Sequence, residues 1–198
     1  MTQPPAGPYI ARDLLHRVQV ARRDRQRLLR VHVPAAEAGQ ARHQDYANAN
    51  VLRRIVSQWG WPTRELLGED ALAAVWEIAL RADALADFQR LALRLLGGAI
   101  VRGEATIQQW AHLHDRCSVN AGDPQRYGTQ YVLGPDGPEP APVEDPDQLD
   151  VRRAAVGLPP YAQTRAALRR RLGWPQAAQA DPEHALSDAA AEPAGVAA

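Results

Sequence analysis

The stretch from Asp115 to Tyr131, DRCSVNAGDPQRYGTQY, combines an acid, arginines, carboxamides and tyrosines. It follows a pattern typical of a helix and leads into a pattern typical of a strand, and its Gly and Pro residues indicate turns. Polar side chains on loops that a rigid scaffold positions often form binding or catalytic sites. The sequence therefore predicts a functional site at this stretch.

Acid/base chemistry is one function that these residue types allow. His112, Asp115 and Arg116 have i, i+3, i+4 spacing on a helix expected over 106–117, so they share one face. A carboxylate beside an imidazole favours its charged form and fixes its orientation, which suits general acid/base catalysis. Arg116 would then stabilise a developing anion. The alternative is a structural cluster that caps the chain reversal, with arginine on backbone carbonyls.

Ligand binding is the second function that the stretch suggests. Carboxamides and phenols offer both hydrogen-bond donors and acceptors, which suits a neutral polar ligand such as an amide or a sugar-like group. The alternative is that the same groups only hold a hairpin together. The candidate ligand-binding residues are Asp83, Gln125, Tyr127, Thr129 and Gln130.

Several other chemistries are disfavoured by the sequence. Cys117 is the single cysteine and falls on the apolar side of its helix, which indicates a packed thiol. His112 and His114 are two residues apart and point to different helix faces, so no metal site is predicted. There is no phosphate-binding loop or dinucleotide fingerprint, so we expect no cofactor. The chain has no lysine, which excludes Schiff-base catalysis.

Composition limits the partners. The 198 residues carry 23 basic and 23 acidic side chains, and the formal net charge is zero. A nucleic-acid-binding protein usually shows a basic excess, so we expect no nucleic-acid partner. No apolar run approaches the ~18 residues of a membrane span, so we expect no membrane partner and a cytoplasmic location. The sequence does not indicate the oligomeric state.

The periodicity of apolar residues predicts a mainly α single-domain helical bundle with a small β-hairpin near 127–143. The helical domain spans 9–173; 1–8 is a disordered lead and 174–198 a disordered tail, because both have few large apolar groups. On the second helix, the expected buried residues are Tyr46, Leu52, Ile55, Val56 and Trp59. The expected helices are 9–33, 37–59, a third from after Gly68 to 82, 87–101, 106–117, 147–156 and 160–172; the expected strands are 127–133 and 138–143.

The order of several motifs resembles an uncharacterised bacterial family, a domain-of-unknown-function family, over about 45–158. The motifs are Asp45, Asn48, Leu52 and Ile55; Gly60-Trp61-Pro62-Thr63 and Gly68; Trp76; Leu113, Asp115 and Arg116; and Gly122, Gln125, Tyr127, Gly128, Thr129 and Gln130. The resemblance implies a shared fold and pocket but no particular activity. One departure stands out: the family pattern has Gln-His-x-Asp on the third helix, and this chain has Leu80-Arg81-Ala82-Asp83. If that histidine is a catalytic base, this chain has lost it, or His112 or His114 replaces it.

From these residues we expect a protein that binds a small polar molecule between the third helix, the fifth helix and the loop 123–130. Acid/base catalysis of a hydrolysis, an elimination or a cyclisation in small-molecule metabolism would extend that role. The alternative is a non-enzymatic protein-protein interaction module whose polar motif is structural. That alternative predicts an exposed apolar groove and no deep pocket.

Overall fold

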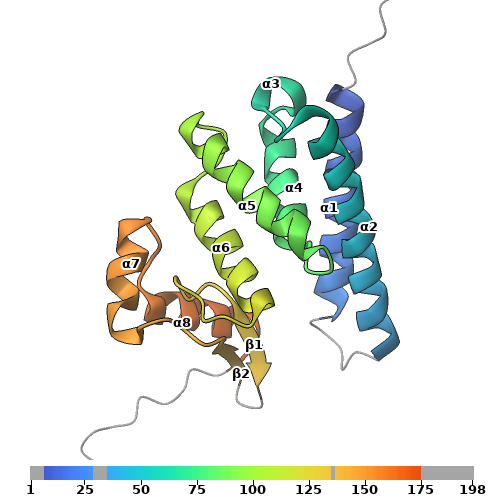
Figure 1. Ribbon diagram of the computed structural model, residues 1–198. Helices are drawn as coiled ribbons and strands as arrows, with labels where there is room; N and C mark the ends of the chain where they lie inside the picture. Colours follow the sequence, from blue (N-terminus) through green and yellow to red (C-terminus); the bar gives the residue numbers. More distant parts are fainter. Residues whose placement is uncertain (1–6, 29–34, 135–136, 175–198) are drawn as a thin grey trace, which may run out of the picture.

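Five long helices pack against one another in the first 121 residues of the chain (Figure 1). They are α1 (Gly7–Leu28), α2 (Ala35–Trp59), α4 (Glu69–Leu80), α5 (Ala86–Val101) and α6 (Ile107–Ala121). The computed structural model describes residues 7–28, 35–134 and 137–174. Apart from residues 7, 8 and 174, the predicted lead and tail lie outside this part. The predicted mainly α fold with a small hairpin is confirmed.

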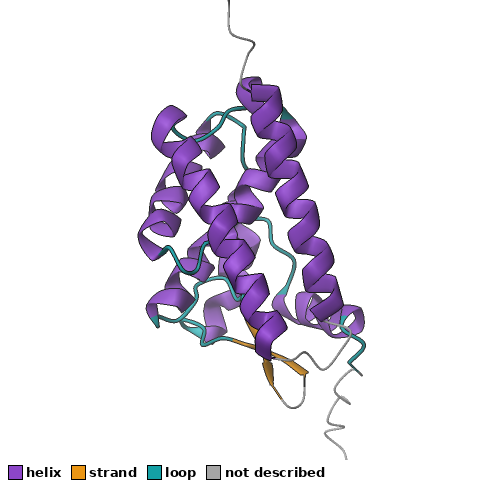
Figure 2. Ribbon diagram, turned by 90° about the vertical axis from the view of Figure 1, so that its right-hand side faces the viewer, coloured by secondary structure: helices purple, strands orange, loops and turns teal. Residues whose placement is uncertain are grey.

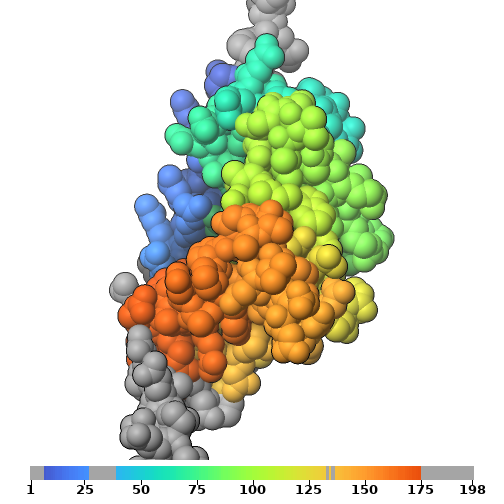
Figure 3. Space-filling view, turned by 90° about the vertical axis from the view of Figure 1, so that its left-hand side faces the viewer, coloured from blue at the N-terminus to red at the C-terminus, as the bar shows by residue number. Residues whose placement is uncertain are grey.

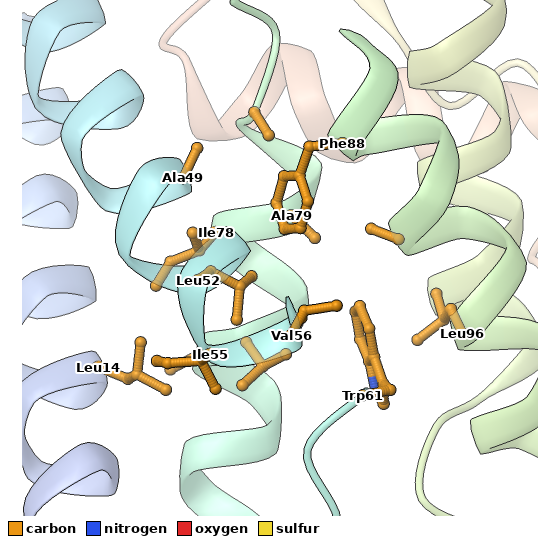
Figure 4. Close-up of a cluster of buried hydrophobic side chains, with 14 of the residues drawn as sticks. Leu14, Ala49, Leu52, Ile55, Val56, Trp61, Ile78, Ala79, Phe88 and Leu96 are labelled. Atoms are coloured by element: carbon orange, nitrogen blue, oxygen red, sulfur yellow. The ribbon is translucent and has the colours of Figure 1, made fainter. Parts of the chain in front are cut away.

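The main core lies between α1, α2, α4 and α5, where apolar side chains recur three and four residues apart. Each large side chain buried there contributes about 1.5–3 kcal/mol. Figure 4 shows these side chains converging from the four helices and from the segment after α2. The buried set includes Leu14, Val18, Leu52, Ile55, Val56, Trp61, Val75, Ile78, Phe88 and Leu96.

The prediction for the buried face of α2 was wrong at two positions. Tyr46 and Trp59 are each 44% exposed, whereas Leu52, Ile55 and Val56 are buried as expected. Tyr46 lies off the buried row of α2, which at this end includes Ala49. Trp59 is the last residue of the helix, and the chain turns after it.

The turn after α2 brings a different tryptophan into the core. Gly60 has a φ of 75°, a left-handed geometry that ends the helix. Trp61, which is 7% exposed, then packs into the core. Thr63 caps α3 (Arg64–Leu67) by accepting a hydrogen bond from the backbone N–H of Leu66 at 3.3 Å. This single turn was not predicted, because four residues are too short to show a period.

Helix α6 has strong signals at both ends. Thr106 and Gln109 form a capping box at its start. Gly122, with a φ of 84°, ends the helix in left-handed geometry. The helix therefore continues beyond its predicted end at Cys117 to Ala121, which places Asn120 on the same rigid element as Arg116.

The hairpin is shorter than predicted. Strands β1 (Tyr131–Gly134) and β2 (Gly137–Pro140) pair in antiparallel register, with Tyr131 opposite Pro140. The segment 127–130, which was expected to begin the first strand, is an irregular loop. The backbone N–H groups of Tyr127 and Thr129 donate to the buried Asp115, and that of Gln130 donates to the buried Gln125, rather than to a neighbouring strand.

The C-terminal segment covers this loop and the adjacent face of α6. It consists of the 3₁₀ turn η1 (Pro146–Gln148), α7 (Leu149–Ala155) and α8 (Tyr161–Arg171). A second, smaller core of Ala111, Tyr127 and Val156 joins it to α6. Figure 2 shows the two strands at one end of the helical bundle. None of the described helices is long and apolar enough to cross a membrane.

Candidate functional site

Asp115, the first residue of the polar stretch, accepts most of the hydrogen bonds that hold the stretch together, and its side chain is fully buried. The carboxylate accepts hydrogen bonds from the backbone N–H groups of Arg126 at 2.9 Å, Tyr127 at 3.0 Å and Thr129 at 3.0 Å. The Thr129 hydroxyl donates a further bond at 2.9 Å. Burial by itself would raise the pKa of Asp115, but the nearby His114 imidazole and the hydrogen bonds from the loop hold that pKa below its usual range. Asp115 is thus an ionised anchor for the loop.

Gln125 has a similar structural role and is also fully buried. Its side-chain amide donates to the carbonyls of Gln130 at 2.9 Å and Ala141 at 2.8 Å, and its oxygen accepts from the N–H of Gln130 at 2.8 Å. These bonds tie the loop to the hairpin. Both donors of the carboxamide are used inside the protein, and its burial keeps the side chain out of reach of a ligand.

Arg153 completes the scaffold and was missed by the sequence reasoning. Only 1% of it is exposed. Its guanidinium donates to the carbonyls of Tyr127 at 2.6 Å and Pro159 at 2.8 Å, and to the hydroxyl of Thr164 at 2.7 Å. An arginine in the sequence DVRRAAV is more typical of a solvated face, so no local signal marked it. Its fork satisfies carbonyls that the loop would otherwise bury without partners.

The expected pairing of His112 with Asp115 is not the one the structure forms. The imidazole nearest to Asp115 is His114, whose Nδ1 lies 3.6 Å from the carboxylate. His112 packs instead edge-on against Trp76, with ring centroids 6.2 Å apart, and burial lowers the pKa of its imidazole. The carboxylate of Asp115 faces the loop, whose backbone N–H groups and Thr129 hydroxyl donate hydrogen bonds to it. Tyr127 lies against Trp110 and His114 in the small core.

A groove of about 480 Å³ lies beside this scaffold, which we call the arginine groove. Figure 3 shows the face on which the red-orange C-terminal helix lies below the blue N-terminal helix. The groove is formed by α1, the end of α4, α6, the hairpin and α8. Its lining residues are Arg25, Arg81, Arg116, Gln130, Tyr131, Val132, Pro138, Leu168, Arg171 and Leu172.

Arg25 is held in the groove wall by two carboxylates. It contacts Glu77 at 2.6 Å and Asp45 at 3.1 Å, and both carboxylates lie on neighbouring helices. Burial raises the pKa of Asp45, although the charges of Arg25 and Arg81 act in the opposite direction. The family-motif residue Asp45 therefore positions a groove arginine.

Arg116 is held in the same way by Asp83. Its Nε donates to Asp83 at 2.8 Å, and a second guanidinium nitrogen contacts the other carboxylate oxygen. Asn120 donates to the same carboxylate at 2.8 Å, and Nη1 of Arg116 lies 3.5 Å from the side-chain oxygen of Gln130. Arg116, Asp83 and Gln130, three of the predicted site residues, thus come together at the groove. Gln125, Tyr127 and Thr129 do not line it.

Arg81 differs from these two arginines. Its Nε is buried without a hydrogen-bond partner among the described residues, and within that part of the chain it makes no ion pair. Burial lowers the pKa of Arg81 and the charges of Arg25 and Arg116 lower it further, whereas the charges of Asp45 and Glu77 raise it. Arg81 stands at the position where the motif resemblance led us to expect a histidine. Arg81 therefore brings to the groove a guanidinium whose Nε has no acceptor among the described residues.

Two other chemistries have little support in the described residues. Burial raises the pKa of the Cys117 thiol to about 11, so it is protonated at neutral pH. Within residues 7–28, 35–134 and 137–174, no group of three or more His, Cys, Asp or Glu side chains could hold a metal ion.

Comparison with known proteins gives a family but no function. A model of a family of unknown function matches residues 10–173. This match confirms the resemblance to such a family that the motifs indicated. No curated protein matches the chain, and no solved structure matches it.

Proposed function

Because the chain belongs to that family of unknown function, DUF6624, we propose its activity from its own side chains: it binds a small anionic molecule in the arginine groove. The groove volume of about 480 Å³ falls in the range of small-molecule sites, roughly 300–1,000 Å³. Four of its lining residues are arginines, from three different helices and the end of a fourth.

The observation that carries the proposal is the unpartnered Nε of Arg81. Buried polar groups in proteins are nearly always hydrogen-bonded, and buried charges are paired. The Nε of Arg81 has no such partner among the described residues. Arg81 lies near two like charges, Arg25 and Arg116, and near the carboxylates of Asp45 and Glu77, which already pair with Arg25. An anion in the groove would supply the missing acceptor and offset this repulsion.

The neighbouring arginines support the same conclusion. Asp83 fixes the guanidinium of Arg116, and Glu77 fixes that of Arg25. Arginines fixed in this way lose less side-chain entropy when a ligand binds. A planar guanidinium matches phosphate and carboxylate groups through two parallel hydrogen bonds. The groove thus favours an anion over the neutral ligand that the carboxamides suggested.

The polar loop has a supporting role in this proposal. The side chains of Asp115, Gln125 and Arg153 form their hydrogen bonds within the protein. The alternative hypothesis, an interaction module whose polar motif is structural, expects the same. The effect of these bonds is to hold Gln130 and Tyr131 at the groove wall. The same alternative also requires an apolar groove, whereas this groove is lined by four arginines. Acid/base catalysis by His112 and Asp115 is not part of the proposal, because neither residue lines the groove.

Titration calorimetry with inorganic phosphate, sulfate and citrate tests the proposal. We expect binding of at least one of these anions, weakened about 10- to 100-fold in Arg81→Gln, because a charge-assisted bond contributes about 1.5–3 kcal/mol. The matched control is Arg94→Gln, since Arg94 is exposed on α5 and lies outside the groove. Equal affinities in both variants, or no heat with any anion, would refute the proposal.

A further inference from the structure

We infer that the ligand of the arginine groove is a soluble anionic amphiphile: a phosphate or carboxylate head group joined to an apolar body. This inference rests on the proposed function and adds the class of the ligand. It follows from the way charged and apolar side chains divide between the two walls of the groove.

The charged wall belongs to the helical bundle. Arg25 is on α1, Arg81 follows the end of α4, and Arg116 is on α6. The three lie close together: burial lowers the pKa of Arg81 most, and the charges of Arg25 and Arg116 lower it further, against the opposing charges of Asp45 and Glu77. Converging guanidinium groups of this kind form a site for one anionic group.

The opposite wall belongs to the hairpin and α8, and most of it is apolar. Arg171 is the charged residue on this wall; the others are Tyr131, Val132, Pro138, Leu168 and Leu172. Val132 is 54% exposed, although it lies in a strand that could have carried a polar residue at an open surface. An apolar body in the groove would cover such a side chain.

Tyr131 gives this wall a fixed shape. Its ring is nearly parallel to that of Tyr161, at 5° and with centroids 6.2 Å apart. Burial raises the pKa of Tyr131, followed by the influence of Tyr161, so its hydroxyl stays uncharged under physiological conditions. The wall therefore cannot become anionic and repel the head group.

The size of the groove supports a ligand larger than a simple anion. Its volume of about 480 Å³ is in the range of sites that enclose organic ligands rather than single inorganic ions. A lone phosphate would neutralise Arg81 but leave the wall of Val132 and Leu168 in contact with water. An alkyl or aryl extension would remove that apolar surface from water, which is favourable.

A homologous series of alkyl phosphates tests the inference by calorimetry. We expect the affinity to rise about three- to fourfold for each added methylene from ethyl to hexyl phosphate, the increment for burying one methylene group. Inorganic phosphate should bind more weakly than any ester in the series. Hexanol, which has the chain but no anion, should bind far more weakly than hexyl phosphate.

Two matched variants locate the apolar contact. Val132→Thr keeps the shape of the side chain but replaces one methyl group with a hydroxyl, and should weaken hexyl phosphate several-fold more than it weakens inorganic phosphate. Val151→Thr is the control, because Val151 is 64% exposed on α7 and does not line the groove. Since both sites are exposed, both variants should fold.

The outcomes separate the inference from the proposed function. If inorganic phosphate binds through Arg81 but chain length has no effect, the amphiphile is refuted and the anion site stands. If no anion binds, both fall. Vesicles containing phosphatidic acid form the last arm: binding to these vesicles without binding to hexyl phosphate would refute a soluble ligand in favour of a lipid surface.

Discussion

Replacing Arg81 with methionine should make the protein more stable and at the same time weaken anion binding about 10- to 100-fold. Methionine is also long and unbranched, but it has neither the charge nor the buried Nε without a partner. A buried donor left unsatisfied costs about 1–3 kcal/mol. Methionine loses the attraction of Arg81 to Asp45 and Glu77, which are partly exposed, and pairs of that kind contribute about 0–1 kcal/mol.

The net gain in the free energy of unfolding is therefore about 1–2 kcal/mol. For a domain of this size, each 1 kcal/mol shifts Tm by about 2–4 °C, so Tm should rise by about 2–8 °C. The gain should be visible without ligand. With an anion at about 100 times its wild-type Kd, the wild type should gain about 2.7 kcal/mol through binding, and the variant, whose affinity is about 10- to 100-fold weaker, should gain about 0.4–1.4 kcal/mol.

The assay is thermal and urea unfolding of both proteins, with and without phosphate. Arg81→Lys serves as a comparison, since it keeps the charge but not the planar fork. A fall in stability of more than about 1 kcal/mol in Arg81→Met would mean that the guanidinium stabilises the empty fold. That result would remove the physical basis of the anion site.

The scaffold supports three further predictions. Asp115→Asn should cost about 2–4 kcal/mol in urea unfolding, because the amide cannot accept all the bonds that the loop donates; a loss below about 0.5 kcal/mol would contradict the anchoring role. The pKa of Asp115 is depressed in the folded state, so its contribution is present above the unfolded pKa of about 3.9 and is lost as pH falls through the folded pKa. The acid limb of wild-type stability should therefore be steeper than that of Asp115→Asn, and parallel limbs would argue against it. Cys117, with a pKa of about 11, should react with a disulfide reagent at pH 8 about a hundredfold more slowly than free cysteine, and a fast reaction would mean an activated thiol.

Helices were predictable wherever a long apolar stripe and a capping signal coincided. The break at Gly60 and the bundle itself follow from such patterns. The end of α6 was placed too early because Ser118 to Asn120 have weak helix propensity, although Gly122 was the signal that could have corrected it. The segment at Tyr127 was taken for a strand because of its residue types. Hydrogen bonds to Asp115, twelve residues earlier, decided its conformation instead.

The candidate site was only partly predictable. Asp83, Arg116 and Gln130 contact one another in the structure, and their role in binding stays a prediction. The roles of Asp115 and Gln125 depend on which groups face them. No spacing rule links Arg25, Arg81 and Arg171, which are far apart in the sequence. The fold alone brings them to one groove.

The hydrogen bonds of Arg153 also have a consequence for the sequence in which parts of the chain fold. The carbonyl of Tyr127 receives its donor from a residue 26 positions later. The early helices can bury their core before α7 exists, but the hairpin side of the groove must wait for it. We expect the bundle to assemble first on a growing chain, and the binding site to mature as a final step once α7 and α8 have docked.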